Sequence, residues 1–278
     1  MQILKDRASA NNFIQNQKQA GKTVGLVPTM GALHLGHLNL VSQCRAENDI
    51  TIASIFVNPI QFNNSTDLAK YPRTFDDDCK KLITVGCDAV FYPPAEEMYP
   101  AQPKLTIDFG QLDKVLEGEF RPGHFSGVGI VVAKLFNILQ PDTAYFGQKD
   151  FQQYLIIKQL VKDLSFPVKL VCANIVREAD GLAMSSRNQR LSAADRTQAA
   201  LLHQVLQQTK ADLALKSLEL LKKDATAFLL LNNIQLEYLA LANRETLEIL
   251  TEYNPAIPAV LLIAGYLGEV RLIDNILI

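Results

Sequence analysis

Apolar runs of five to eight residues recur along the first 176 positions of the chain, separated by segments with helical spacing. Residues 23–28 (TVGLVP) and 50–57 (ITIASIFV) are apolar almost throughout, which is typical of parallel strands buried on both faces. Further runs of the same character lie at residues 89–93, 143–147 and 169–176. The pattern therefore predicts a parallel sheet within residues 1–176.

Helical patterns fill the intervals, at residues 37–48, 74–86 and 150–164. The second of them opens with Thr74 as the expected N-cap, and Asp76, Asp77 and Asp78 favour the positive end of its dipole. Strand–helix–strand repetition implies right-handed crossovers. We therefore predict an α/β protein with a Rossmann-like, doubly wound parallel sheet.

The pattern changes after residue 176. Residues 178–191 are polar and rich in turn formers, and long helices follow at about 192–210 and 217–231. Strands are then expected at residues 235–242, 259–267 and 269–278. We predict two domains: residues 1–176 with the doubly wound sheet, and residues 177–278 as a smaller α+β C-terminal domain.

Charge and composition narrow the choice of partners. The 278 residues carry a formal charge of −2 with a pI of about 6.1, so no overall field attracts nucleic acid or an anionic membrane. The apolar stretches are too short to span a bilayer, and charge appears by residue 5, unlike a signal peptide. Four cysteines without C-x-x-C spacing favour reduced thiols over disulfides or zinc. We expect a soluble, cytoplasmic protein with no nucleic-acid and no membrane partner.

The most distinctive stretch is PTMGALHLGH, residues 28–37, which follows a predicted strand and opens a predicted helix. Pro28 is expected to end the strand, and Gly31 permits a close approach that a side chain would block. His34 and His37 are three positions apart, so both rings can face an anion at the helix N-terminus. An isolated H-x-G-H is also compatible with a capped turn bearing exposed histidines. Its place at the carboxyl end of a strand favours a phosphate site.

Two other segments offer complementary groups. Lys149 and Asp150 in FGQKD follow another predicted strand, where a lysine can meet a phosphate and an aspartate a ribose hydroxyl. The alternative there is a surface ion pair. AMSSRN, residues 183–188, offers hydroxyls and a guanidinium in a loop that can close over a triphosphate, or it is a plain linker.

Amide side chains mark a candidate substrate pocket. Gln61 in FVNPIQF follows the second strand and suits a carboxylate or hydroxyl, and Gln153 lies one turn beyond Lys149. Arg121 and His124 in FRPGHFSGV form either an anion contact or a turn. P-loop, nucleophile-elbow and metal-ligand motifs are lacking, and the candidate groups are neutral or cationic. This favours catalysis by positioning and charge stabilisation on a phosphate, without a covalent enzyme intermediate.

Seven blocks together resemble one family: PTMGALHLGH, FVNPIQF, YPRTFDDD, FRPGHFSGV, FGQKDFQQ, VREADGLAMSSRN and RLIDNI. In this order, and over nearly the whole chain, they are similar to the pantoate–β-alanine ligases. That family belongs to the HIGH-motif nucleotidyltransferase superfamily. HLGH resembles the HIGH element, and MSSRN resembles the mobile KMSKS-type loop of the superfamily.

The resemblance implies an AMP-forming ligation in two steps. The carboxylate of (R)-pantoate attacks the α-phosphate of ATP, which releases pyrophosphate and leaves pantoyl adenylate. The amine of β-alanine then attacks the acyl carbon, which gives pantothenate and AMP for coenzyme A biosynthesis. The resemblance also implies Mg²⁺ on the ATP phosphates and a homodimer. Residues 1–176 would bind ATP and pantoate, and residues 177–278 would act as a lid.

The same blocks imply the roles of individual residues. His37 would donate a proton to the departing group, and His34 would contact phosphates. The catalytic set would be His34, His37, Lys149 and Arg187. Gln61 and Gln153 would hold pantoate, and Gln61 would also border the β-alanine site. The ATP-binding residues would be Met30, Gly31, Ala32, Leu33, His34, Leu35, Gly36, His37, Gly147, Gln148, Lys149, Asp150, Val176, Met184, Ser185, Ser186 and Arg187.

Two positions depart from the family pattern. Gln148 stands where many members carry glutamate, which removes a charge. Asn63 stands where glycine is common, so the family pattern does not predict the conformation of residues 61–68.

Rival functions also remain. The nearest is a nucleotidyltransferase that joins a nucleotide to a phosphorylated small molecule; the two glutamines and the long second domain argue against it. An aminoacyl-tRNA synthetase is disfavoured by the length and charge of the chain. A nucleotide-binding regulatory module without turnover is disfavoured by the full set of His, Lys, Ser and Arg candidates.

Overall fold

Six parallel strands form one sheet in the computed structural model, which describes residues 1–278. Their order is β1-β4-β3-β2-β5-β6. The strands are β1 (Gln2–Leu4), β2 (Val24–Thr29), β3 (Ile50–Ile55), β4 (Ala89–Phe91), β5 (Thr143–Gly147) and β6 (Lys169–Ala173). All but β1 overlap the apolar runs, so the predicted Rossmann-like, doubly wound α/β sheet is confirmed.

The chain divides into two compact units. Unit 1 comprises Met1–Gly147 with Gln152–Ala173, and it contains the parallel sheet. Unit 2 comprises Asn174–Ile278 and also the short segment Gln148–Phe151. The turn that follows β5 thus belongs to the second unit, although β5 itself and most of the next helix belong to the first.

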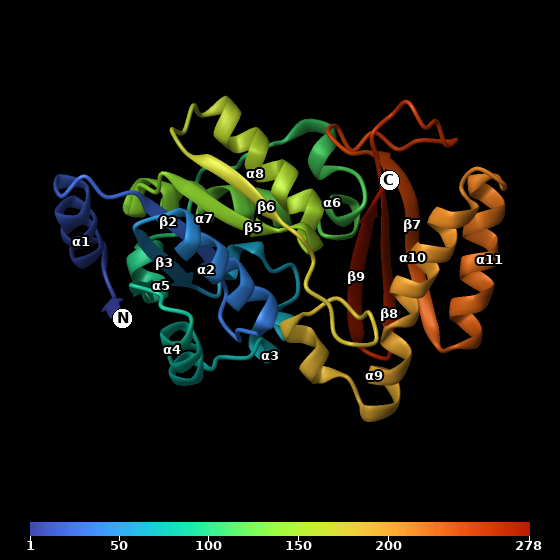
Figure 1. The fold of residues 1–278 in the computed structure, drawn as a ribbon, viewed down its shortest axis with the longest axis horizontal. Coiled ribbons are helices and arrows are strands. Elements are labelled where there is room, and N and C mark those ends of the chain that lie inside the picture. The colour runs from blue at the N-terminus through green and yellow to red at the C-terminus, as the bar shows by residue number, and fades with distance from the viewer. The chain divides into compact units, whose positions relative to one another are not determined.

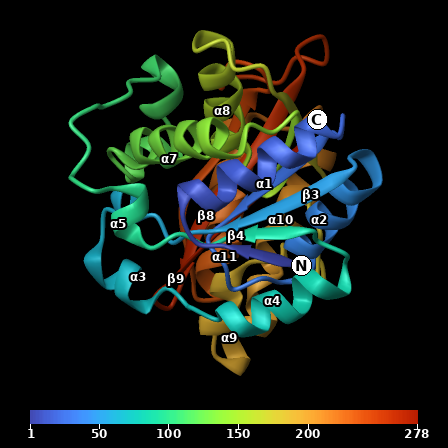
Figure 2. The ribbon, with the colours of Figure 1, turned by 90° about the vertical axis from the view of Figure 1, so that its left-hand side faces the viewer.

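Alternate residues of the central strands contribute to two cores. Val24 and Leu26 of β2 lie in the core on one face of the sheet, and Val27 lies in the core on the other. The first face is covered by α1 (Arg7–Gln19), α7 (His124–Leu139) and α8 (Phe151–Asp163), and the second by α2 (Leu35–Glu47) and α4 (Phe75–Thr84). Figure 2 shows α1 and α7 side by side on the first face. Because both faces are covered, the strands are apolar throughout.

Helix α7 is an element that the sequence pattern did not predict. Twelve of its sixteen residues are buried, so Ser126, Lys134 and Asn137 leave only a narrow polar stripe as a signal in the sequence. His124, grouped with Arg121 as either an anion contact or a turn, follows a turn at residues 122–123 as the first residue of the helix, and it is buried. Arg121 lies nearby, with its guanidinium 3.9 Å from the Glu117 carboxylate. Strand β1 and helix α1 were also not predicted.

Unit 2 contains a three-stranded antiparallel sheet in the order β7-β8-β9. Its strands are β7 (Ile234–Asn243), β8 (Ala259–Leu267) and β9 (Val270–Leu277), and its helices are α9 (Ala193–Ala199), α10 (Leu201–Asp212) and α11 (Leu218–Leu231). Figure 1 shows α10 and α11 alongside this sheet. The single helix expected at 192–210 is broken at Ala200. Ala199 before the break and Leu202 after it lie in the same apolar core.

Short helices complete the chain: η1 (Pro59–Gln61), α3 (Ser65–Lys70), α5 (Ala95–Met98), η2 (Gly110–Asp113), α6 (Glu117–Phe120), η3 (Gln148–Asp150) and η4 (Ser186–Arg190). Asn64 caps α3, and the side-chain amide of Asn63 donates to the carbonyl oxygen of Pro122. These contacts define the shape of residues 61–68. None of the helices combines the length and the hydropathy that a bilayer crossing requires.

Candidate functional site

The winding of the parallel sheet reverses at β2, whose two neighbours are β3 and β5. Helix α2, which follows β2, packs on one face, and α8, which follows β5, packs on the other. The two connections leave in opposite directions, and open α/β sheets bind ligands at the carboxyl ends of strands beside such a reversal. The predicted phosphate loop, residues 30–37, follows β2 at this point.

The loop after β2 has a constrained backbone. Gly31 has φ +81° and Ala32 has φ +51°, so two successive residues adopt left-handed conformations. Glycine does so without strain, whereas a residue with a Cβ stays there only where its surroundings hold it. Helix α2 then begins at Leu35, two residues before its predicted start.

Helix α4 holds this loop through two side chains. Both oxygens of Asp78, a fully buried residue, accept hydrogen bonds: Oδ2 from the Ala32 amide at 2.8 Å and Oδ1 from the Leu33 amide at 2.7 Å. Nearly one turn further on, Nζ of Lys81 donates to the Leu33 carbonyl oxygen at 2.6 Å. Ala32 and its neighbour Leu33 are thus fixed through both of their amide donors and through the Leu33 carbonyl oxygen.

Sequence reasoning did not find this role for Asp78. It lies in the first turn of α4 as predicted, but its carboxylate is directed to the loop, and the hydroxyl of the N-cap residue Thr74 donates to it at 3.2 Å. A sequence signal did exist, because Asp78 is four positions before Leu82 and so shares the buried face of the helix.

His34 and His37 contact each other at the N-terminus of α2. His34 is the N-cap, and its Nδ1 accepts a hydrogen bond from the Gly36 amide at 3.2 Å. Nδ1 of His37 accepts from the His34 amide at 3.4 Å, and the ring centroids are 4.0 Å apart. An accepting nitrogen carries no proton, so each neutral ring bears its proton on Nε2. Both histidines are therefore Nε2 donors beside a helix N-terminus, which attracts anions.

Gln61 is held from several sides in unit 1. The side-chain amide of Asn58 donates to its Oε1 at 3.0 Å, and its own Nε2 lies 3.0 Å from Sδ of Met30. Its main-chain oxygen is 2.8 Å from Nδ1 of His124. Sulfur is a weak acceptor, so this amide is suited to donate to a stronger one, such as a carboxylate or hydroxyl.

A cavity of about 620 Å³ lies at the carboxyl ends of β1 to β4, a size typical of small-molecule sites. Met30, Gly31 and Asp78 contribute to its lining. The rings of Phe75 and Tyr92, which also line it, stack with centroids 3.8 Å apart. One side of the strained loop therefore borders this cavity.

The second glutamine of the predicted substrate pair, Gln153, is half-buried on α8. Its neighbour Gln152 has a structural role. Nε2 of Gln152 donates to the carbonyl oxygens of Leu112 at 2.7 Å and Val115 at 2.8 Å, and its Oε1 accepts from the Glu117 amide at 3.0 Å. Gln152 is therefore held by the backbone of residues 112–117, and Gln153 makes no such contact with that segment.

Lys149 and Asp150 lie in η3, directly after β5. Nζ of Lys149 is 3.7 Å from Oδ1 of Asp150, and the two side chains are 19% and 50% exposed. The backbone of this turn is held by Asn275 of β9, which donates to the carbonyl oxygens of Gln148 and Lys149. The ion pair that the sequence allowed as the alternative is therefore present, with a lysine side chain that is mostly buried.

The segment with Met184 to Arg187 is an ordered turn in unit 2. The Met184 amide donates to the Val176 carbonyl oxygen at 3.0 Å, and Arg177 and Ala183 form an antiparallel bridge. Ser185 caps η4 through a hydrogen bond from the Arg187 amide at 3.3 Å. Met184 and Ser186 are buried, and Arg187 is half-buried.

The predicted residues thus fall into two groups. Within unit 1, the loop from Met30 to His37 contacts Gln61 through Met30. Within unit 2, η3 with Lys149 and the segment 176–187 both contact β9 through hydrogen bonds. No group of three or more His, Cys, Asp and Glu side chains is arranged to hold a metal ion.

Comparisons with known proteins point to one family. The model of the pantoate-beta-alanine ligase family matches residues 2–277. A pantothenate synthetase of Cytophaga hutchinsonii is 46% identical over 268 residues, which cover 95% of both chains. A pantothenate synthetase of Porphyromonas gingivalis is 45% identical over 277 residues, which cover 99% of both chains.

Solved structures agree with this. The crystal structure of a pantothenate synthetase from Thermus thermophilus is similar with a TM-score of 0.91 and 40% identity, over 99% of each chain. A pantoate-beta-alanine ligase from Francisella tularensis, crystallised with beta-gamma ATP and beta-alanine, has a TM-score of 0.85 and 36% identity. That match covers 100% of this chain and 97% of the other.

Proposed function

This chain belongs to the pantoate–β-alanine ligase family and ligates pantoate to β-alanine with ATP, and we propose that it does so through a pantoyl-adenylate intermediate. In the first step a carboxylate oxygen of pantoate bonds to the α-phosphorus, and the bond to the bridging oxygen breaks, releasing pyrophosphate. In the second, the amine of β-alanine bonds to the acyl carbon, loses a proton, and AMP departs.

The observation that carries this proposal is the pair of histidines at the start of α2. Bringing a carboxylate to a triphosphate opposes two anions, and negative charge then builds on the leaving pyrophosphate. Nε2 donors on His34 and His37, fixed by backbone amides on their Nδ1 atoms, can offset both charges. We assign His37 the proton donor to the leaving group and His34 a phosphate contact.

The other ATP contacts are proposed for each unit in turn. In unit 1, the backbone of residues 30–37 and Gly147 would line the nucleotide site. In unit 2, the turn 148–150 would supply Lys149 to the phosphates and Asp150 to the ribose. Val176 would contact adenine, and Met184, Ser185, Ser186 and Arg187 would meet the triphosphate, excluding water that hydrolyses an acyl adenylate.

Pantoate is assigned to the two glutamines of unit 1. Gln61 has an amide whose Oε1 is already occupied by Asn58, so it would donate through Nε2 to the acid or its hydroxyl. Gln153 would share this contact, and Gln61 would border the β-alanine site. Holding both substrates in a reactive geometry is itself a large catalytic contribution.

Mg²⁺ would arrive with ATP as part of the substrate. The ion prefers oxygen ligands and keeps several waters, so it binds mainly through phosphate oxygens with one or two carboxylates. Because Asp150, the carboxylate of the turn 148–150, is assigned to the ribose, the phosphate oxygens and water would supply the ligands of the ion. We also propose that the enzyme acts in the cytoplasm and that it is a homodimer. Size-exclusion chromatography with light scattering would test the dimer.

The experiment is a set of omissions. The purified chain is incubated with ATP, Mg²⁺, pantoate and β-alanine, each reactant is left out in turn, and AMP, pyrophosphate and pantothenate are measured. We expect AMP and pantothenate in equal amounts only in the complete mixture, and enzyme-bound adenylate without β-alanine. AMP retained in the product would instead identify a nucleotidyltransferase.

A further inference from the structure

The block RLIDNI has no role in the function proposed above, yet two of its side chains are deeply buried. Asp274 and Asn275, near the end of β9, are 4% and 1% exposed. Adjacent residues of a strand point to opposite faces of the sheet, so the two side chains meet different neighbours. Buried polar side chains are retained where they are fully hydrogen-bonded.

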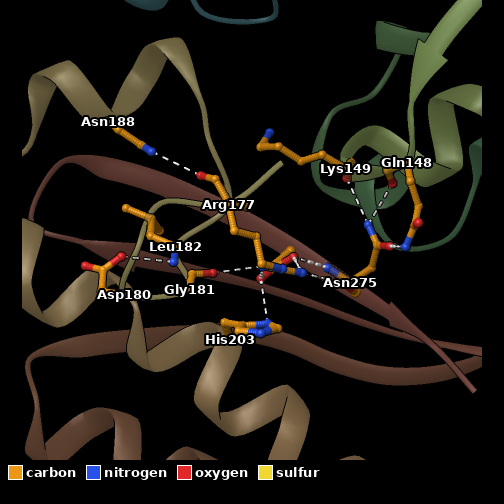
Figure 3. A network of polar contacts seen from close by, with 11 residues as sticks. Gln148, Lys149, Arg177, Asp180, Gly181, Leu182, Asn188, His203 and Asn275 are labelled. Carbon is orange, nitrogen blue, oxygen red and sulfur yellow. Dashed lines mark hydrogen bonds and ion pairs between the residues drawn. The ribbon is translucent and has the colours of Figure 1, made fainter. Parts of the chain in front are cut away.

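Asn275 is bonded to the turn after β5, as Figure 3 shows. Its Nδ2 donates to the carbonyl oxygens of Gln148 at 2.9 Å and Lys149 at 3.0 Å, and its Oδ1 accepts from Nε2 of Gln148 at 3.0 Å. Two carbonyl acceptors require an amino group, so the partners themselves fix the orientation of the amide. Three hydrogen bonds to two consecutive residues set the backbone from which the Lys149 side chain extends.

Asp274 makes the corresponding connection on its own side of β9. Its carboxylate accepts two hydrogen bonds from the Arg177 guanidinium, at 2.6 and 3.0 Å, and Nδ1 of His203 lies 3.5 Å away. Arg177 also donates to the carbonyl oxygens of Gly181 at 3.0 Å and Asn275 at 3.4 Å. The same end of β9 therefore holds the beginning of the segment that carries Met184 to Arg187.

We propose that Asn275 is a positioning residue for Lys149, and that the end of β9 keeps Lys149 and the 184–187 segment in one register. The proposal rests on the assignment of Lys149 to the ATP phosphates. A lysine has a flexible four-carbon stem, so its ammonium reaches a defined point only when its backbone is fixed. The contacts of Asn275 supply that constraint, and they explain why η3 belongs to the same compact unit as the segment 176–187.

The test uses Asn275→Ala, which removes all three hydrogen bonds, and measures pantoate-dependent exchange of pyrophosphate into ATP. We expect the exchange rate to fall by up to about 100-fold, because displacement by about 1 Å has such an effect. Arg271→Ala is the matched control. It breaks the ion pair of β9 with Glu237, away from η3, and should lower the melting temperature without lowering exchange.

A double-mutant cycle with Lys149→Ala separates positioning from general damage. If Asn275 acts through Lys149, adding Asn275→Ala to Lys149→Ala costs little further exchange. If the exchange rate of the double variant falls by the product of the two single losses, the proposal is overturned. Full exchange in folded Asn275→Ala would also overturn it. If Lys149→Ala alone keeps full exchange, the assigned role of Lys149 is the part that fails.

Asn275→Asp serves where the alanine variant does not fold. It keeps the size and the acceptor for Gln148, but places an oxygen against two carbonyl oxygens. Exchange should fall as in the alanine variant and recover, relative to the parent chain, as the pH is lowered and the new carboxyl regains a proton. A ratio to the parent that is constant with pH, in folded protein, would contradict the proposal.

Discussion

Oδ1 of Asp78 accepts a hydrogen bond from the backbone amide of Leu33 at 2.7 Å, across 45 positions of sequence. The partner oxygen accepts from Ala32, the residue with positive φ. The shape of the loop at the carboxyl end of β2 is therefore determined by a helix on the second face of the sheet. Substitutions in α4, away from any proposed ligand contact, should alter catalysis.

Asp78→Ala should destabilise the chain and impair its reaction. It leaves two buried amides without acceptors, which costs about 1–3 kcal/mol for each in the free energy of unfolding. The loop should then relax, raising KM for ATP and lowering kcat. Urea denaturation and steady-state kinetics measure the two effects. Asp77→Asn, in the same turn but exposed and paired with Lys80, is the control and should change little. Wild-type kinetics in a folded Asp78→Ala variant would disprove the role.

Gly127→Ala should raise KM for pantoate. A Cβ at Gly127 would lie 2.5 Å from the carbonyl oxygen of Ile60 and 2.8 Å from Cα of Gln61, both of them backbone atoms. Helix α7 and η1 must then move apart, so the position of Gln61 relative to α7 changes. Such overpacking typically costs about 1–3 kcal/mol of stability.

Gly129→Ala is the control for this effect, because it lies in the same helix and makes the same chemical change. Its Cβ would meet side-chain atoms of Phe109 and Ile107, which can shift, rather than the Gln61 backbone. KM for pantoate should stay near that of the parent chain. Equal increases in both variants would mean that the effect belongs to α7 as a whole.

Asp274→Asn should be less stable at neutral pH, and the difference should shrink in acid. Burial raises the pKa of Asp274, but the Arg177 guanidinium with the nearby His203 outweighs it and leaves that pKa below its ordinary value. A carboxyl with a lowered pKa stabilises the fold above its unfolded pKa of about 3.9, and this contribution is lost as the pH falls through the folded pKa.

Urea denaturation of both proteins between pH 7 and pH 3 measures that difference. Removing one partner of a buried ion pair costs about 3–5 kcal/mol, so a gap of that order is expected at pH 7. Asp180→Asn, at an exposed pair with Arg196, should show a much smaller gap. A gap for Asp274→Asn that does not change with pH would contradict the account.

The native cysteines should react slowly with thiol reagents at pH 7 to 8. Burial raises the pKa of Cys44 to about 12 and those of Cys87 and Cys172 to about 11, and it raises that of Cys79 as well. Thiolates, the reactive form, are therefore scarce. Alkylation followed by mass spectrometry checks this. A cysteine that is labelled rapidly in the native state would contradict the raised pKa of its thiol.

The parts of the fold that were predicted from sequence are those set by neighbouring residues. The apolar strand β2, the turn after it and helix α2 are adjacent in the chain, so their pattern could be recognised in PTMGALHLGH. Helix α7 was missed for the opposite reason. Its surroundings bury twelve of its sixteen residues, which leaves only a narrow polar stripe from which to recognise it.

The contacts that hold the site were missed because they join distant positions. Asp78 bonds to Ala32 across 46 residues, and Asn275 bonds to Gln148 across 127. In the sequence, Asp78 was one of three acidic residues at a helix start, and Asn275 was part of a motif without an assigned role. The one local signal, the place of Asp78 four residues before Leu82 on the buried face of α4, does not reveal which remote loop the carboxylate contacts.

Exchange of labelled pyrophosphate into ATP, without β-alanine, tests the central claim most directly. The parent chain should catalyse exchange only when pantoate is present. His37→Ala should lose about 100- to 1,000-fold of the exchange rate, the usual cost of removing one donor to a developing charge, while the protein stays folded. Parental exchange in His37→Ala, or exchange by the parent chain that does not depend on pantoate, would contradict the account.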